Sequence, residues 1–363
     1  MLRNISLLLI VTLISFAGFS QVADSTKKND TAPPAPAPAL TITGSADMYY
    51  RYDFNKTNTD LTSFTGSHDQ FKLGMATVRL EHKTTKLDMV ADLGFGPRAQ
   101  EFAYNDNGIL QAIKQLYISY SPTAWVKFTG GTWATHIGYE VLDAYANRNY
   151  SMSYMFTNGP FSHTGVRADF TVGKSGIMIG VSNPTDCRSI PDGKQNNKNM
   201  IAQYSFAPSD NFKLFLNYVG GKDADDNKVH QYDLVINAKA SSLFSLGLNG
   251  TVNESSSPMD HWTAGHTWWG TALYLNLDPK PWFGLTLRSE YFSDKDGVKL
   301  HPVDGAPGAK VFANTLSANF KVDGFIFIPE FRYDHGSENL FTKKDGTDTR
   351  SGASVLLAAI YSF

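Results

Sequence analysis

The sequence predicts an all-β chain that forms a transmembrane, antiparallel, up-and-down β-barrel of about sixteen strands. Three observations lead to this prediction. Apolar and polar residues alternate with a period of two along most of the chain after residue 40, the connections between alternating segments are short and long in turn, and the N-terminus carries one short apolar run. Together these are the features of a barrel exported to an outer membrane.

Composition excludes several other classes of protein. The 363 residues contain 32 Lys and Arg against 34 Asp and Glu, a formal net charge of -2, so the chain lacks the basic excess typical of nucleic-acid binders, and no nucleic-acid partner is expected. A single cysteine, Cys187, allows neither an internal disulfide nor a cysteine-based zinc cluster. A helical membrane protein would need repeated spans of about 20 apolar residues, and these are missing from the sequence.

The first 39 residues predict export. Arg3 precedes the apolar stretch 5–16, and the small residues Gly18 and Ser20 predict cleavage before Gln21, so residues 1–20 are expected to be a signal peptide. Pro and Ala alternate near the end of residues 21–39, which predicts an extended periplasmic linker. The barrel is then expected to occupy residues 40–363, in the outer membrane.

Alternation defines the strands. Near 282–292, Phe283, Leu285 and Leu287 share one face while Thr286 and Arg288 share the other, which is the period of a strand and not of a helix. In chain order, the expected strands lie near 41–54, 71–83, 87–95, 111–120, 125–134, 163–172, 176–182, 198–206, 212–219, 228–239, 243–251, 268–277, 282–292, 310–321, 325–334 and 351–363.

The connections distinguish a barrel from a β-sandwich. Tight turns of roughly three to five residues alternate with long polar stretches, as in outer-membrane barrels. The long stretches are 55–70, 96–110, 135–162, 182–197, 252–267, 293–309 and 335–350. Strands of about 10 residues suit a tilted membrane crossing, whereas sandwich strands average about 5 or 6. Aromatic residues near segment ends, which we interpret as interface girdles, include Tyr49, Tyr50, Tyr52, Trp125, Trp268, Trp269, Trp282, Phe283, Phe331 and Tyr333.

Charged residues in mid-strand are expected to line a water-filled lumen, because a dry sandwich core would not accept them without partners. Opposite charges often stand two residues apart on one face, and such neighbours should neutralise each other and leave a weak ion preference. The expected lining residues are Arg51, Asp53, Arg79, Glu81, Lys127, Arg167, Asp169, Arg288, Glu290, Glu330 and Arg332. The expected neutralising pairs are Arg51/Asp53, Arg167/Asp169, Arg288/Glu290 and Glu330/Arg332.

The longest connection, 135–162, is the third of the long set and is a candidate pore constriction. If it folds inward, Glu140 and Asp143 opposed to Arg148 would create a transverse field across the lumen. The alternative is an exterior cap exposed to the medium.

One stretch resembles a known family. Residues 147–170, NRNYSMSYMFTNGPFSHTGVRADF, are similar to the segment in which a long loop leads into a strand in the OmpL-like putative β-barrel porin family of Gram-negative outer membranes. The export signal, the strand rhythm and the terminal Phe363 agree with this family. The resemblance implies a channel for small solutes.

Chemistry-bearing motifs are few. The nine His residues include no HExxH pattern and no G-x-S-x-G elbow is present, so no catalytic residue, cofactor or metal is expected. The predicted function is therefore passive diffusion of small hydrophilic solutes or ions through a porin, with outer-membrane lipid around it and a homotrimer as the expected assembly. The alternatives are a membrane-embedded hydrolase with a rim active site and a plugged structural or adhesive barrel.

Overall fold

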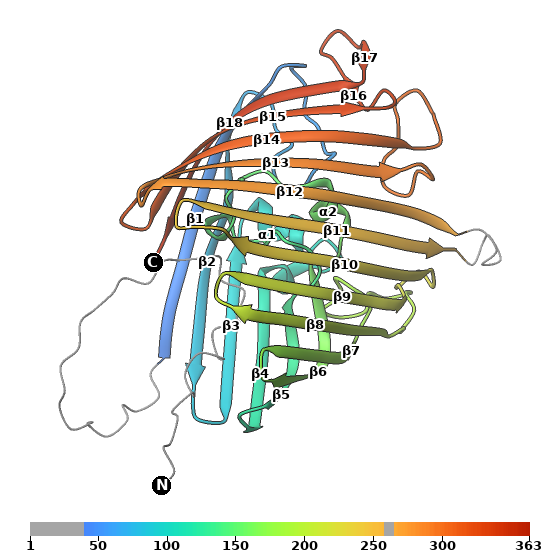
Figure 1. Ribbon diagram of the computed structural model, residues 1–363. Helices are drawn as coiled ribbons and strands as arrows, with labels where there is room; N and C mark the ends of the chain where they lie inside the picture. Colours follow the sequence, from blue (N-terminus) through green and yellow to red (C-terminus); the bar gives the residue numbers. More distant parts are fainter. Residues whose placement is uncertain (1–39, 258–264) are drawn as a thin grey trace.

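The computed structural model describes residues 40–257 and 265–363, which form a closed antiparallel barrel (Figure 1). Each barrel strand pairs with its neighbours along the chain, and the last pairs with the first. The strands are β1 (Leu40–Asp53), β2 (Gln70–Lys83), β3 (Leu87–Phe95), β4 (Ile113–Thr123), β5 (Val126–Ala134), β6 (Ser162–Val172), β7 (Ser175–Ser182), β8 (Asn199–Ser209), β9 (Phe212–Lys222), β10 (Lys228–Lys239), β11 (Phe244–Ser256), β12 (His266–Lys280), β13 (Phe283–Asp294), β14 (Ala309–Val322), β15 (Phe325–Gly336) and β18 (Ser351–Ser362).

The predicted sixteen-stranded barrel is confirmed, and the expected strands match the observed ones within a few residues. The connection expected at 252–267 is shorter than predicted, because β11 continues to Ser256 and β12 begins at His266. Elements that the alternation did not predict lie in the connections: helices α1 (Pro97–Phe102) and α2 (Tyr154–Asn158), 3-10 turns η2 (Gly108–Ala112) and η3 (Ala144–Ala146), and the small hairpin β16 (Phe341–Thr342) and β17 (Asp348–Thr349). The expected signal peptide and linker lie outside the described residues.

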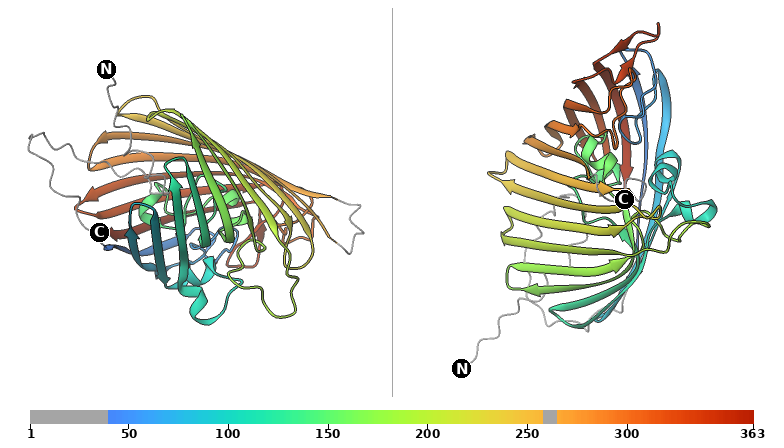
Figure 2. Two further views of the ribbon diagram at one scale, coloured as in Figure 1. Left: turned by 90° about the horizontal axis from the view of Figure 1, so that it is seen from below. Right: turned by 90° about the vertical axis from the view of Figure 1, so that its right-hand side faces the viewer.

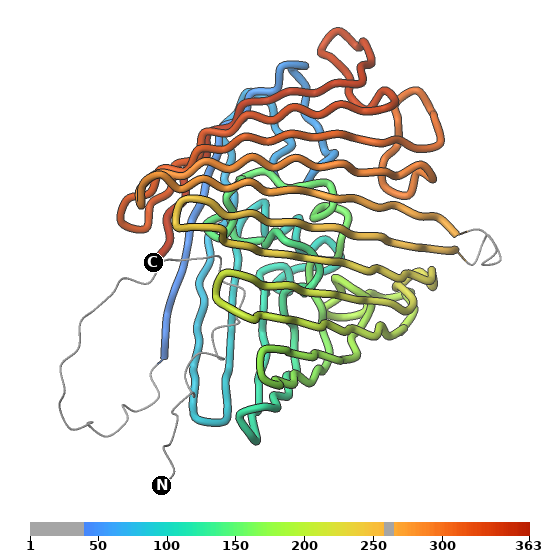
Figure 3. Tube along the Cα trace, in the orientation of Figure 1, coloured from blue at the N-terminus to red at the C-terminus, as the bar shows by residue number. Residues whose placement is uncertain are grey.

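The two ends of the barrel differ. The tight turns lie at one end together with the closing contact between β1 and the residue after β18, where Gly44 and Phe363 exchange backbone hydrogen bonds of 3.1 and 3.0 Å. We call this the turn end, and the opposite end, which carries the long connections, the loop end. The tube in Figure 3 shows the short turns on one side and the long connections on the other.

The outer face is apolar, as the alternation predicts. On β4, the outward side chains of Leu116 and Ile118 are 48% and 59% exposed, while the inward Ser119 is 3% exposed. The same pattern repeats around the barrel and suits a wall in contact with lipid. Among the described residues, no helix is both long and apolar enough to cross a bilayer.

The interior is not the uniformly wet wall that the sequence predicts. The connection between β5 and β6 turns inward and crosses the enclosed space, where α2 lies between the strands on opposite sides of the barrel (Figure 2). We call residues 135–161 the plug. Four buried apolar clusters occupy the interior, and each contains at least one plug residue.

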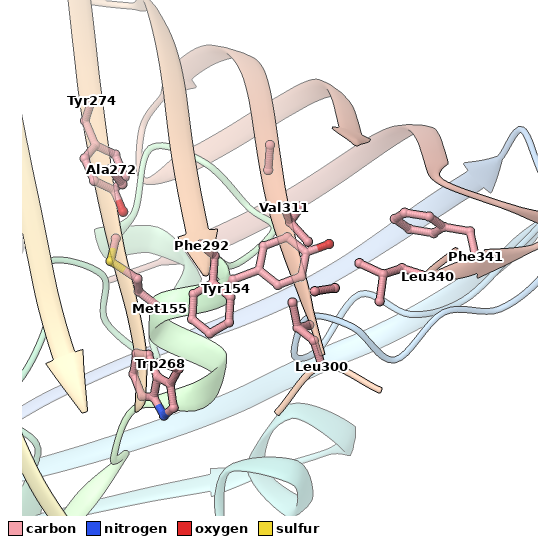
Figure 4. Close-up of a cluster of buried hydrophobic side chains, with 12 residues drawn as sticks. Tyr154, Met155, Trp268, Ala272, Tyr274, Phe292, Leu300, Val311, Leu340 and Phe341 are labelled. Carbon is pink, nitrogen blue, oxygen red and sulfur yellow. The ribbon is translucent and has the colours of Figure 1, made fainter. Parts of the chain in front are cut away.

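The plug supplies much of the core. In the cluster drawn in Figure 4, Tyr154 and Met155 of α2 pack against Phe292 and Trp268 of the wall. Another cluster joins Tyr150 to inward residues of the wall. Two of the expected girdle residues therefore belong to the interior: Trp268 packs against Phe292, and Tyr49 packs against Tyr150 with ring centroids 5.5 Å apart. Neighbouring aromatics such as Trp268 and Trp269 cannot both face lipid, because successive side chains of a strand point to opposite faces.

Candidate functional site

The plug enters and leaves the lumen through a closed stem. The amide of Thr135 donates to the carbonyl of Phe161 at 3.0 Å, and the Thr135 hydroxyl lies 3.0 Å from Nε2 of His163. Beyond the stem, the His136 ring contacts the carbonyl of Tyr218 at 3.0 Å, and the amide of Gly138 donates to Asp233 at 3.0 Å. The plug is thus fastened to β9 and β10 within four residues of its start.

The three predicted constriction residues all lie in the plug, and each pairs with the wall. Glu140 accepts from Arg288 at 2.5 Å, and Asp143 accepts from Lys114 at 2.6 Å. Arg148 donates to both carboxylate oxygens of Asp278, at 2.8 and 2.6 Å. The loop therefore folds into the lumen, but these charges do not face one another across open water as the sequence analysis expected. Each is neutralised by a wall residue instead.

Wall carboxylates bind the backbone of the plug. Glu330 accepts from the amides of Tyr150 and Ser151 at 2.8 and 3.2 Å. Glu290 accepts from the amides of Tyr154 and Met155, both at 2.9 Å. An irregular segment inside a barrel has no ladder partners for its amides, and a buried amide without an acceptor is costly. The two carboxylates supply those acceptors.

Wall arginines bind the plug carbonyls in the same way. Arg288 donates to the carbonyl of Ser151 at 2.7 Å, and Arg332 donates to that of Met152 at 2.7 Å. Two of the four expected neutralising pairs form, Arg51 with Asp53 at 2.7 Å and Arg167 with Asp169 at 3.3 Å. The other two do not form, because the plug recruits Arg288, Glu290 and Glu330, while Arg332 pairs with Asp334 at 2.9 Å.

Two tyrosines anchor the plug, and sequence reasoning missed their partners. The Tyr150 hydroxyl donates to Asp47 at 2.5 Å, and the Tyr154 hydroxyl donates to Asp334 at 3.1 Å. Asp47 and Asp334 share strand faces with predicted lining residues, so alternation alone could have identified them. Arg98, whose guanidinium lies 4.7 Å from the Tyr150 ring centroid, is in a loop helix and carried no such signal.

The predicted lining residues all lie on inward faces but fall into two groups. One group is buried against the plug and the loops: Arg51, Asp53, Arg288, Glu290, Glu330 and Arg332. The other lies toward the turn end and keeps access to solvent: Arg79, Glu81, Lys127, Arg167 and Asp169. Two cavities flank the plug, one bordered by Arg51, Arg332 and Ser151, the other by Gly138, Gln231 and Asn249.

The comparisons with known proteins give the family. The family described as "putative beta-barrel porin-2, OmpL-like" matches residues 39–363, nearly the whole chain. The chain belongs to this family. It is an outer-membrane β-barrel porin. No curated protein matches the sequence.

Solved structures share the fold of this porin at low sequence identity. The outer membrane channel DcaP of Acinetobacter baumannii is 13% identical, with a TM-score of 0.60, covering 96% of this chain and 100% of that one. An anion-selective porin from Comamonas acidovorans is 11% identical, with a TM-score of 0.62, covering 90% and 100%. The trimer form of OmpT, an outer membrane protein of Vibrio cholerae, is 10% identical, with a TM-score of 0.59, covering 90% and 100%.

A neighbouring loop secures the exit of the plug in this porin. Asp186 accepts from the amides of Phe161 and Ser162, both at 2.7 Å, and from the Tyr104 hydroxyl at 3.0 Å. Burial raises the pKa of Asp186 to about 6, against the opposing effect of these donors. The adjacent Cys187 is 2% exposed, and burial raises the pKa of its thiol to about 11. This thiol is therefore protonated and shielded at neutral pH.

Proposed function

We propose that this porin passes small hydrophilic solutes by passive diffusion through narrow gaps between the plug and the barrel wall. The insertion of the third long connection into a closed barrel of sixteen strands is the observation that carries the proposal. A barrel with 16 to 18 strands has room for an aqueous channel. A plug fastened along that channel reduces it to gaps that only small solutes can cross.

The proposal gives the charged residues distinct roles. Glu140, Asp143 and Arg148 set the narrow section, since they fasten the plug to three different parts of the wall. The solvent-accessible lining residues Arg79, Glu81, Lys127, Arg167 and Asp169 surround the wider section toward the turn end. No step requires bond chemistry or a cofactor, so we propose a channel and not an enzyme.

We also propose the surroundings of the channel. The apolar outer face contacts outer-membrane lipid, and three copies associate through part of that face, as the solved trimer form of a protein with the same fold suggests. Export by residues 1–20, with cleavage before Gln21, and a periplasmic linker over 21–39 remain part of the proposal.

A second candidate is a structural barrel closed by its own plug. The complete burial of Tyr150, Met152 and Tyr154, each 0% exposed, favours it, because these side chains of the middle of the plug have no contact with solvent. In that case the barrel would carry no solute in its resting state.

Liposome swelling distinguishes the two candidates. Liposomes containing the folded porin are placed in isotonic solutions of mono-, di- and trisaccharides, with liposomes containing the boiled protein as the control. Diffusion through narrow gaps predicts swelling that decreases steeply with sugar size. Absence of swelling with every sugar, although the barrel remains folded, would reject the porin proposal and leave the closed barrel.

A further inference from the structure

Inward charges near the turn end are unevenly distributed around the barrel. On β2 to β6 the two signs balance, and several pairs stand directly opposite each other in the register: Arg79 with Asp92, Lys83 with Asp88, and Lys127 with Asp169. Glu81 and Arg167 complete this set. Neighbouring opposite charges on these strands cancel at short range, so this part of the wall creates little net field.

The opposite part of the wall is basic. In the turn-end halves of β9 to β14, apart from Arg288, which is paired with Glu140, the inward charged residues of the described chain include Lys239 and Lys321 together with the carboxylate of Asp278, and Arg148 of the plug joins them. The strand faces follow from contacts nearer the loop end. Lys239 shares a face with the inward Asp233, and Lys321 shares one with the inward Ser317.

Arg148, Lys239 and Lys321 gather around Asp278, and we call these three cations the basic rim. Arg148 is fixed by its two bonds to Asp278, and its carbonyl accepts from Asn319 at 2.9 Å. Lys239 lies opposite Ser245 of β11, which lies opposite Asn276 of β12, two residues from Asp278. Lys321 lies two residues from Asn319, on the same strand face. One carboxylate therefore stands among three cations, and the cluster keeps a net positive charge.

The rim is accessible from the lumen. The side chains of Arg148 and Asp278 are 29% and 25% exposed, in contrast to the buried pair of Arg288 and Glu140 at 0% and 4%. Gly284 leaves the space for this arrangement, because a Cβ there would lie 2.5 Å from the Asp278 carboxylate. A positive cluster on a low-dielectric wall, beside the narrowest section, raises the local concentration of anions.

We propose that the basic rim makes this porin prefer small anions, such as chloride and organic carboxylates, over cations of equal size. The inference rests on the proposed function, since it concerns solutes that diffuse through the lumen. The preference is electrostatic and therefore decreases at high salt, where the Debye length falls from about 10 Å at 0.1 M to about 3 Å at 1 M.

The reversal potential of the purified porin in a planar bilayer, under a potassium chloride gradient, tests the proposal. The test variant is the double substitution Lys239→Gln and Lys321→Gln, which removes two charges and keeps side-chain length. The matched control is Lys343→Gln with Lys344→Gln, two exposed lysines next to the β16–β17 hairpin at the loop end. Folding of each variant is checked by its migration in electrophoresis before and after boiling.

We expect the wild type to favour chloride, the test variant to lose at least about half of the chloride-to-potassium permeability ratio, and the control to keep it. The preference of the wild type should also fall when the salt concentration is raised from 0.1 M to 1 M. A wild type that favours potassium, or a permeability ratio that is equal in the test variant and the wild type, would overturn the proposed anion preference of the basic rim and leave the proposed function standing. A folded wild type that carries no current would overturn the proposed function together with the rim.

Discussion

At the scale of single residues, the plug is held by charged side chains that bind backbone groups as well as opposite charges. Arg288 shows this most clearly, because it is 0% exposed and donates to Glu140, to the carbonyl of Ser151 and to the hydroxyl of Thr315. Such a residue cannot be removed without leaving several buried partners unsatisfied.

Substituting Arg288→Gln is expected to destabilise the folded barrel strongly, by about 3–5 kcal/mol, since it leaves the Glu140 carboxylate buried without its cation. The measurement is the temperature at which the folded band disappears in electrophoresis of detergent samples. The matched control is Arg350→Gln, because Arg350 and Glu338 form an exposed pair at 3.8 Å, and an exposed pair contributes only about 0–1 kcal/mol. Equal losses in the two variants would contradict the role given to Arg288.

His136, at the start of the plug, is expected to make the stability of the plug depend on pH. Burial lowers the pKa of His136 to about 4, with Arg167 acting in the same direction and the Tyr218 carbonyl opposing it. A free histidine titrates near pH 6.5. The folded state therefore favours the neutral ring, so stability from this residue is present above pH 6.5 and is lost as the pH falls from 6.5 toward 4.

Hydrogen exchange of residues 135–161 at pH 7 and pH 4.5 checks this expectation. After correction for the intrinsic amide exchange rate at each pH, the plug of the wild type should be less protected at pH 4.5 than at pH 7, and His136→Gln should reduce that difference. His163, whose ring centroid lies 5.0 Å from that of His136, remains in both proteins, so part of the pH dependence is expected to persist. Identical pH profiles in the two proteins would refute the assignment to His136.

At the scale of elements, the plug fits the wall because specific wall positions leave room for it. Gly247 on β11 is such a position, since a Cβ there would lie 2.3 Å from the ring of Tyr139. That ring is stacked on Tyr274 with centroids 4.0 Å apart and has no room to move back. Gly250 on the same strand has nothing within 4 Å of a Cβ and provides the matched control.

Gly247→Ala is expected to cost about 1–3 kcal/mol through overpacking, and Gly250→Ala much less. Adding Tyr139→Ala to Gly247→Ala should recover part of the loss, because the two residues are coupled through their contact. Four variants, the two single glycine substitutions, Tyr139→Ala alone and the double substitution, are compared by the temperature at which the folded band is lost. If Tyr139→Ala lowers the stability of Gly247→Ala by as much as it lowers that of the wild type, the two residues are not coupled, and the proposed contact between the ring of Tyr139 and position 247 is wrong.

The strands were predictable from the sequence and the path of the plug was not. Alternation is local, so each strand could be located from a few neighbouring residues, as with β3 at 87–95 and β10 at 228–239. The path of the plug depends on hydrogen bonds to residues far away in the chain, such as those of Asn149 with Ser317 and of Tyr150 with Glu330. Because Glu330 binds the amide of Tyr150, it does not pair with Arg332 as expected.

At the scale of the whole molecule, one chain forms both the wall and the obstruction inside it. The closed barrel separates an apolar outer face from an interior in which the plug contributes to four apolar clusters and several ion pairs. The sequence predicted the wall, the outer face and the porin family, and offered inward folding of loop 135–162 as one of two alternatives, but it predicted that the inward charges line water where they in fact bind the plug. A charged residue on an inward strand face can line water or hold an inserted loop, and the alternation pattern is the same in both cases.

In the proposed function, the plug is the element that narrows the lumen of an otherwise open barrel. Replacing residues 139–158 with a short Gly and Ser linker keeps the stem contact between Thr135 and Phe161 and the contacts of His136 and Gly138 with the wall, and removes α2 and every other contact of residues 139–158. Electrophoresis before and after boiling confirms that the shortened barrel is closed. The wall residues that held the plug would then face water, which solvates them.

Single-channel conductance in a planar bilayer compares this variant with the wild type. We predict a small conductance for the wild type and one that is larger by about two-fold or more for the variant, because removing the plug opens a lumen as wide as sixteen strands allow. Equal conductance in the two folded proteins would contradict the claim that the plug determines passage through this barrel.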